Sequence, residues 1–441
     1  MPRLLPTLLI AAAGGAACGA AALHAETLVE AYEAARAFDA PLQSAQAGYD
    51  ATVYRAEQLR AGVLPAVGFS ATAGRTLTEI TPGGDRNGNA QTVGINGTQP
   101  LYRPANRIAI EQGQRQVAAA RAALDGAVQD LTVRVAQAYF DVLAAQDTLA
   151  VVQAQKAAVT QQLAFAQRNF EIGAATITDS REAQARADLV AAQEIATDNE
   201  LRVRRLALDQ LLGRTGVQPR PLALPAALPE LAPAMLEGWV AQAQEAQPAV
   251  RQAQLALDVA RLEVRRAETG HLPTVDLTAG YNVQRYPSGS LILPFPYRTN
   301  ATSVGVQLNL PLFAGFAVQN RVRETLALEE RAAADLDNAR RTVAQQVRTL
   351  FLGALSGASQ VRALETAEAS SQSALDANRL GYEVGVRINI DVLNAQSQLF
   401  QTRRDLAQAR YNVLMAQLRL RQAAGVLTTQ DLQNVNALLT P

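Results

Sequence analysis

The spacing of apolar residues changes along the chain from a helical period to a period of two and back again. Residues 26–62 have a helical composition, and alternation of apolar and polar residues begins after Leu64 and Pro65. Alternation of this kind predicts strands with one apolar and one polar face. The predicted strands span about 64–80, 90–102, 272–286 and 300–313, and the turn-rich stretch TPGGDRNGN separates the first two.

The second pair of strands shows the two faces most clearly. Apolar residues occupy every second position from Val275 to Val283, with polar side chains between them. A soluble antiparallel sheet shows the same alternation when its apolar face lies on a core. No neighbouring segment is free to cover this face, however, and ten residues of strand extend ~33 Å, enough to cross a bilayer core of ~30 Å. The pattern therefore favours a transmembrane β-barrel. Because the smallest such barrels have about eight strands, four strands per chain require an oligomer.

Long tracts without proline follow both pairs of strands. They span about 105–169 and 317–380, and in the first tract apolar residues recur every seven positions, as in a coiled coil. A helix of ~65 residues is ~100 Å long. Shorter helical tracts follow at about 179–212 and 391–424. We expect these helices to project from the membrane as a tube, and the alternative is a periplasmic coiled-coil scaffold without a pore.

The chain contains an internal repeat of about 210 residues. VGINGTQPLY at 93–102 recurs as VGVQLNLPLF at 304–313, and IGAATITD at 172–179 recurs as VGVRINID at 384–391. Such self-similarity indicates that one structural unit was duplicated. The predicted organisation is a signal peptide at 1–25, a first repeat at 26–212, a proline-rich connector at 213–234, a second repeat at 235–425 and a C-terminal tail at 426–441.

Composition and charge exclude several classes of function. Lys and Arg together number 40, as do Asp and Glu, and this neutral balance argues against a nucleic-acid partner. An apolar run follows Arg3, and Ala25 precedes an acidic residue, as in an export signal. Cleavage after Ala25 removes Cys18 and leaves one histidine, His271, so neither a metal site nor a cofactor is predicted. Lipoprotein processing at Cys18 is the alternative, although Gly15 stands where a lipobox favours Leu.

Sequence motifs of enzymes and of transmembrane helices are both missing. The chain has no GxGxxG at a strand–helix junction, no P-loop, no HExxH and no GxSxG. Beyond the signal no apolar run reaches the ~18 residues of a spanning helix. We therefore predict a protein without enzymatic activity whose contact with membrane lipid is made through its strands.

Segments along the whole mature chain resemble the TolC-like family of outer-membrane efflux and secretion channels. They include ETLVEAYEAARAFDAPLQSA, AQAYFDVLAAQDTL, TGHLPTVDLTAGYN, GYEVGVRINIDVLNAQ and LAQARYNVLMAQLRLRQAAGVL. The resemblance implies an α/β membrane protein: a homotrimer with a 12-stranded transmembrane β-barrel, continued by a long periplasmic α-helical barrel. It further implies a passive exit duct in the Gram-negative outer membrane. A periplasmic adaptor and an inner-membrane transporter, ABC-type or proton-driven, would recruit it for drug efflux or type I secretion.

The same resemblance implies a constriction at the periplasmic end of the duct. Three copies of Asp391 would form a ring of negative charge, which favours cations. Asn394 stands where the family has a second aspartate, so the strength of cation binding there is left open. The pairs that would lock the closed state are Tyr382 with Asp179 and Arg387 with Thr178, and the tip glycines that would dock the adaptor are Gly173 and Gly385.

The residues themselves leave a structural interpretation of these positions open. Asp179 and Glu182 have the spacing of a capping box, and Asp391 can cap its own helix in the same way. Gly173 and Gly385 are ordinary turn residues on any account. Capping a helix and closing the duct are compatible roles, so Asp179 can have both.

Overall fold

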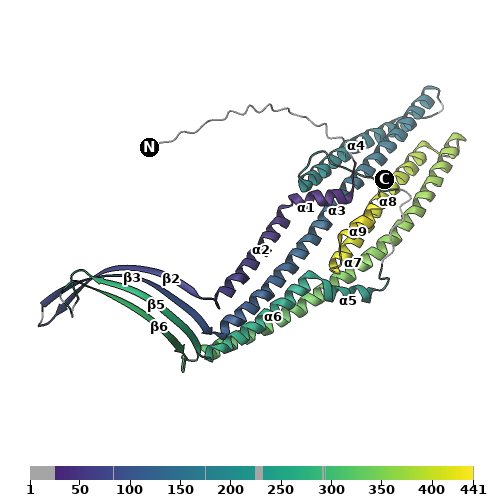
Figure 1. Cartoon of the computed structure of the whole chain (residues 1–441). Helices are drawn as coiled ribbons and strands as arrows, with labels where there is room; N and C mark the ends of the chain where they lie inside the picture. Colours follow the sequence, from purple (N-terminus) through teal and green to yellow (C-terminus); the bar gives the residue numbers. More distant parts are fainter. Residues whose placement is uncertain are drawn as a thin grey trace, which may run out of the picture.

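The chain is elongated, with a curved sheet at one end and long helices that lead away from it (Figure 1). The computed structural model describes residues 25–82, 84–173, 175–223, 232–290, 293 and 295–440. Cys18 and the predicted signal peptide, apart from its last residue, lie outside these residues, as does part of the proline-rich connector. Within the described ranges no helix has both the length and the apolar character needed to span a membrane.

Six elements follow one another in the same order in both halves of the chain. The first half contains α1 (Leu28–Phe38), α2 (Ala40–Ala61), β2 (Ala66–Ile80), β3 (Gly84–Tyr102), α3 (Pro104–Glu171) and α4 (Ile177–Leu212). The second half contains α5 (Leu236–Ala246), α6 (Pro248–Glu268), β5 (Thr274–Tyr286), β6 (Tyr297–Asn309), α7 (Ala317–Glu383) and α8 (Asn389–Ala423). The short strands β1 (Ala25–Glu26) and β4 (Gln218–Pro219), the 3₁₀ turn Thr269–His271 and α9 (Thr429–Asn436) complete the described elements.

The four long strands form one antiparallel sheet in the order β2, β3, β5, β6. Ile95 pairs with Phe69 on one side and Tyr281 on the other, and Ala279 pairs with Val304. Because paired residues share a face and side chains alternate along each strand, the valines of all four strands lie on one face. We call this the apolar face. It is uncovered within the chain, since Phe69 is 71% and Val304 74% exposed.

Hydroxyl and amide side chains occupy the opposite, polar face. Asn282 of β5 donates a hydrogen bond to Asn96 of β3 at 3.5 Å, and Thr278 donates to the Gly305 carbonyl of β6 at 3.3 Å. The register therefore matches the predicted division of the strands into an apolar and a polar face.

Both edges of the sheet are open within the described chain. β2 has 15 residues and β6 has 13, and each is hydrogen-bonded to a neighbouring strand on one side only. Unpaired edge strands of this length present rows of free backbone donors and acceptors. Strand direction alternates across the sheet, so β6 of one copy can run antiparallel to β2 of another copy.

An ion pair fixes the junction between sheet and helices. Arg103, which directly precedes α3, donates two hydrogen bonds to the carboxylate of Asp276 in β5, at 2.8 and 2.7 Å. Asp276 is 9% exposed on the polar face. Bidentate pairs of this kind have a defined geometry. The pair therefore holds the start of α3 against a strand of the other repeat.

The largest core lies midway along the helices, around α3. Leu131, Val135 and Phe140 of α3 are at most 1% exposed and pack with residues of α1, α4, α8 and α9. The predicted seven-residue seam of α3 therefore faces the core. Tyr411 of α8 donates a hydrogen bond at 2.6 Å to Asp147 of α3, and burial raises the pKa of both groups.

The first hairpin differs from its prediction. β3 begins at Gly84 rather than near residue 90, because β2 and β3 stay paired out to Ile80 and Gly84. The glycine and asparagine residues that indicated a loop join the ladder, since pairing satisfies their backbone donors and acceptors. Composition indicated a turn here, whereas the hydrogen-bonded partner strand determines the conformation.

Candidate functional site at the helix tips

The repeated motifs form two tips at the ends of the helices farthest from the sheet (Figure 1). One tip joins α3 to α4 through Gly173, and the other joins α7 to α8 through Gly385. These glycines have φ angles of +76° and +80°, and a Cβ atom at either position would meet no atom within 4 Å. Backbone conformation, not lack of space, therefore requires glycine at both tips.

Large apolar side chains are exposed around both tip glycines. Ile172 is 77% exposed at the first tip, and Val384 and Val386 are 65% and 75% exposed at the second. Exposed apolar side chains grouped at each tip make the tips candidates for a protein-binding site.

Thr176 caps the helix that carries Asp179. The Thr176 hydroxyl oxygen accepts a hydrogen bond from the Asp179 backbone N–H at 3.3 Å, and the Asp179 carboxylate accepts one from the Thr176 N–H at 3.0 Å. This reciprocal arrangement is a capping box. The predicted box of Asp179 with Glu182 is therefore wrong in its register, because α4 begins at Ile177 and Asp179 is its third residue.

Asp391 lies in the first turn of α8 but does not cap it. α8 begins at Asn389, its N-cap residue is Ile388, and no side chain provides a cap. The Asp391 carboxylate instead lies 3.6 Å from the Arg387 guanidinium, with both side chains partly exposed. The capping interpretation of Asp391 is therefore wrong, and its charge is available for another role.

The residues of the predicted lock lie near one another but are not paired within one chain. Tyr382 packs edge-on against Phe165, with ring centroids 5.8 Å apart. Arg387 forms an ion pair with Asp391, and the Asp179 carboxylate accepts a hydrogen bond from the Thr176 backbone N–H. In the described part of a single chain, therefore, neither the pair of Tyr382 with Asp179 nor that of Arg387 with Thr178 is formed.

Asn389 joins the two tips and was not among the predicted site residues. It is fully buried; its amide nitrogen donates to the Asp179 carbonyl at 3.2 Å, and its amide oxygen accepts a hydrogen bond from Gln162 at 2.5 Å. Nearby, Arg186 of α4 donates to Asn394 of α8 at 3.3 Å. The repeat contained a signal, because the position equivalent to Asn389 in the first half is the apolar Ile177.

Solved outer-membrane proteins share the fold of this chain. VceC, an outer membrane protein of Vibrio cholerae, aligns with a TM-score of 0.78 at 19% identity, over 90% of this chain and 96% of that one. The open-state MtrE outer membrane channel of Neisseria gonorrhoeae aligns with a TM-score of 0.73 at 20% identity, over 91% and 89%. The arrangement of one four-stranded sheet and long helices is therefore a known channel fold.

Sequence comparison defines the family. Outer membrane protein TolC of Vibrio cholerae is 32% identical over 437 residues, covering 99% of this chain and 98% of the relative. The alkaline protease secretion protein AprF of Pseudomonas aeruginosa is 33% identical over 413 residues, covering 91% and 84%. Residues 31–214 and 239–426 each match the Outer membrane efflux protein family. The chain belongs to this family, which confirms the resemblance found in its sequence.

Proposed function

We propose that this protein is the outer-membrane exit duct of a tripartite efflux or type I secretion system. The observation that carries the proposal is the sheet, with an uncovered apolar face and two open antiparallel edges. Long helices lead from this sheet to exposed tips, as a tube through the periplasm requires (Figure 1). The full-length similarity to an outer membrane TolC and to a protease secretion protein supports the same assignment.

Closure of the sheet requires several copies of the chain. Because strand direction alternates, β6 of each copy can pair with β2 of the next without breaking the antiparallel order. Three copies, the number that the family resemblance implies, give a 12-stranded barrel with the apolar face toward lipid and the polar face toward the lumen. At 1.5 Å per residue the 68 residues of α3 extend ~100 Å, so the helices of three copies form the wall of a long periplasmic barrel.

The constriction of this duct lies at the α8 tip. Three Asp391 carboxylates around the axis would favour cations. The Arg387 guanidinium, 3.6 Å from the Asp391 carboxylate, offsets part of that negative charge. One helical turn farther along α8, the neutral Asn394 replaces a second carboxylate, and its amide oxygen accepts a hydrogen bond from Arg186. Pairs of Tyr382 with Asp179 between neighbouring chains would hold the closed state, together with the pairs formed by Arg387 and Thr178.

Opening is a shift between two packings of the tip helices, biased by a partner bound at the tips. A periplasmic adaptor is the proposed partner, and the exposed Ile172, Val384 and Val386 beside Gly173 and Gly385 provide its docking surface. The inner-membrane transporter, ABC-type or proton-driven, would supply the energy. The duct itself would carry out passive transport without enzymatic activity or a cofactor.

Deletion of the gene is expected to increase cellular retention of a fluorescent efflux substrate or to abolish secretion of a type I substrate. The wild-type chain should restore export. A chain with Ile172→Asp and Val386→Asp should reach the outer membrane without restoring export, because charge on the tips weakens an apolar docking surface. Unchanged export after deletion, with the chain released as a soluble protein by osmotic shock, would instead support a periplasmic scaffold.

A further inference from the structure

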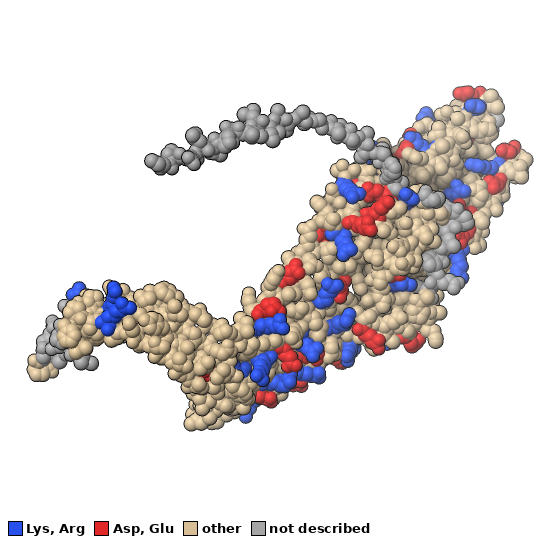
Figure 2. Space-filling model, viewed as in Figure 1, with Lys and Arg blue, Asp and Glu red and all other residues tan. Residues whose placement is uncertain are grey.

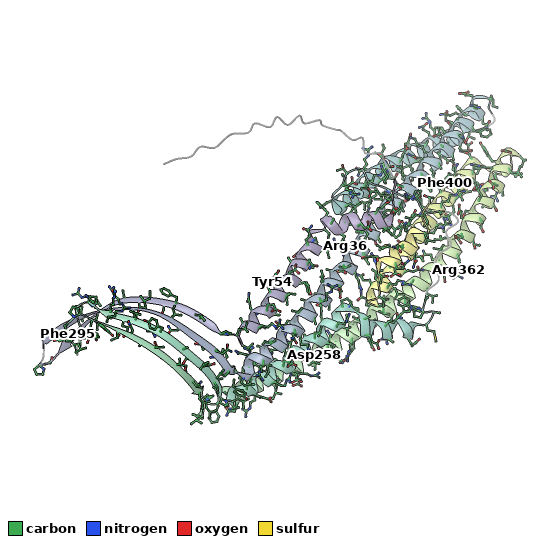
Figure 3. The ribbon with its side chains drawn as sticks, viewed as in Figure 1. Arg36, Tyr54, Asp258, Phe295, Arg362 and Phe400 are labelled. Atoms are coloured by element: carbon green, nitrogen blue, oxygen red, sulfur yellow. The ribbon has the colours of Figure 1, made fainter. Side chains whose placement is uncertain are left out.

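Arginines occupy the outer end of the apolar face, at the end of the sheet away from the helices. Arg285 of β5 pairs directly with Arg298 of β6, and Arg75 continues the apolar row of β2. All three side chains are exposed. Figure 2 shows basic residues near the far end of a sheet that is otherwise almost free of charge, and Phe295 marks the same end in Figure 3.

The pairing of Arg285 with Arg298 is unfavourable for an isolated chain. Like charges directly opposite each other on neighbouring strands destabilise a sheet. In the part of the chain that the structure describes neither arginine forms an ion pair, and Arg298 donates a hydrogen bond to the neutral Asn300 at 3.0 Å. The acidic Glu79 of this face lies four residues beyond Arg75, ~13 Å farther along the strand. Among the described side chains the arginine pair therefore lacks a counter-ion.

The position of the arginines relative to the apolar row indicates what supplies the negative charge that would balance them. From Val275 to Val283 the apolar residues of β5 extend ~26 Å along the strand, which at a tilt of about 40° spans ~20 Å of the ~25 Å height of the apolar band of a transmembrane barrel. Arg285 is the next residue on the same face. If the apolar face contacts lipid, as the proposed barrel requires, these guanidinium groups lie level with the headgroups of the outer leaflet.

We propose that Arg75, Arg285 and Arg298 bind the phosphate groups of an anionic glycolipid in the outer leaflet. The guanidinium fork suits phosphate oxygens, with which it forms bidentate hydrogen bonds. In the closed barrel β6 adjoins β2 of the next copy, so Arg298 and Arg75 of neighbouring copies extend the basic surface around the rim. This inference rests on the proposed function, because it requires the barrel.

The test measures glycolipid binding to the purified oligomer by native mass spectrometry. The probe is lipid A with two phosphates, compared with phosphatidylcholine and with inorganic phosphate. Neutralisation of a basic residue near a charged membrane surface is expected to weaken binding about fivefold, so R285Q/R298Q should bind lipid A about 25-fold more weakly than wild type. The control R323Q/R348Q removes the same charge from exposed positions of α7 and should bind like wild type.

Conductance of each preparation in a planar bilayer separates the two proposals. Equal lipid A binding by wild type and R285Q/R298Q, with conductance intact, overturns the glycolipid site alone. Inorganic phosphate that binds as tightly as lipid A overturns it as well, because the site would then not select a lipid. No conductance from any variant overturns the duct and, with it, the glycolipid site.

Discussion

Val304→Arg is expected to prevent stable insertion of the sheet into the outer membrane. Val304 lies near the middle of β6, is 74% exposed on the apolar face, and pairs with Ala279 at the centre of the apolar row of β5. Arginine on the lipid face of a barrel near the bilayer midplane costs about 2–4 kcal/mol. Each copy in an oligomer contributes this cost, so the combined effect should exceed that of most single substitutions.

Ser303→Arg provides the matched control. Ser303 is the preceding residue on the same strand, is also exposed, and points to the polar face. We expect Ser303→Arg to leave the amount of protein in purified outer membranes nearly unchanged, and Val304→Arg to reduce it strongly. Equal tolerance of both substitutions would show that the apolar face does not meet lipid, and greater damage from Ser303→Arg would assign the two faces the other way round.

Phe140→Ala is expected to destabilise the helical region by about 3–5 kcal/mol, the usual cost of removing a buried phenylalanine ring. Phe140 is 1% exposed, and its ring centroid lies 6.0 Å from that of Tyr139 and 5.8 Å from that of Tyr411. Alanine would leave a cavity beside the buried hydrogen bond of Tyr411 to Asp147.

Chemical denaturation of the detergent-solubilised protein, followed by circular dichroism, measures this loss. Phe140→Leu is the control, because a hydrophobic substitution of similar volume usually costs less than about 1.5 kcal/mol. The two variants should differ clearly in their denaturation midpoints. Identical midpoints would mean that this core does not determine the stability of the helical region.

The sequence predicted those parts of the fold that depend on local periodicity. The apolar row from Val275 to Val283 and the seven-residue seam of α3 both face the side that their spacing indicated. These patterns are reliable because side chains alternate along a strand and recur about every 3.6 residues along a helix, so the spacing alone determines which residues share a face. The number of copies was not accessible in this way and came from the resemblance to a family.

Contacts between distant segments were the part that the sequence did not reveal. The ion pair of Arg103 with Asp276 joins residues 173 positions apart, and Asn389 is fixed by partners in α3 and α4. Neither is encoded by spacing, because side-chain partners depend on how whole elements pack. The Thr176 cap was recognisable in principle, since Thr-x-x-Asp before a helix is a local signal.

Single-channel conductance of the purified protein in a planar bilayer tests the central claim most directly. A duct closed at Asp391 should show small, discrete, cation-selective conductance steps, and Asp391→Asn should lower the cation-to-anion permeability ratio several-fold because it removes the ring of charge. If Asp391→Asn leaves the conductance and the permeability ratio unchanged, the constriction is formed by other residues. A protein that forms no pores and stays soluble without detergent would contradict the claim that this chain is an outer-membrane duct.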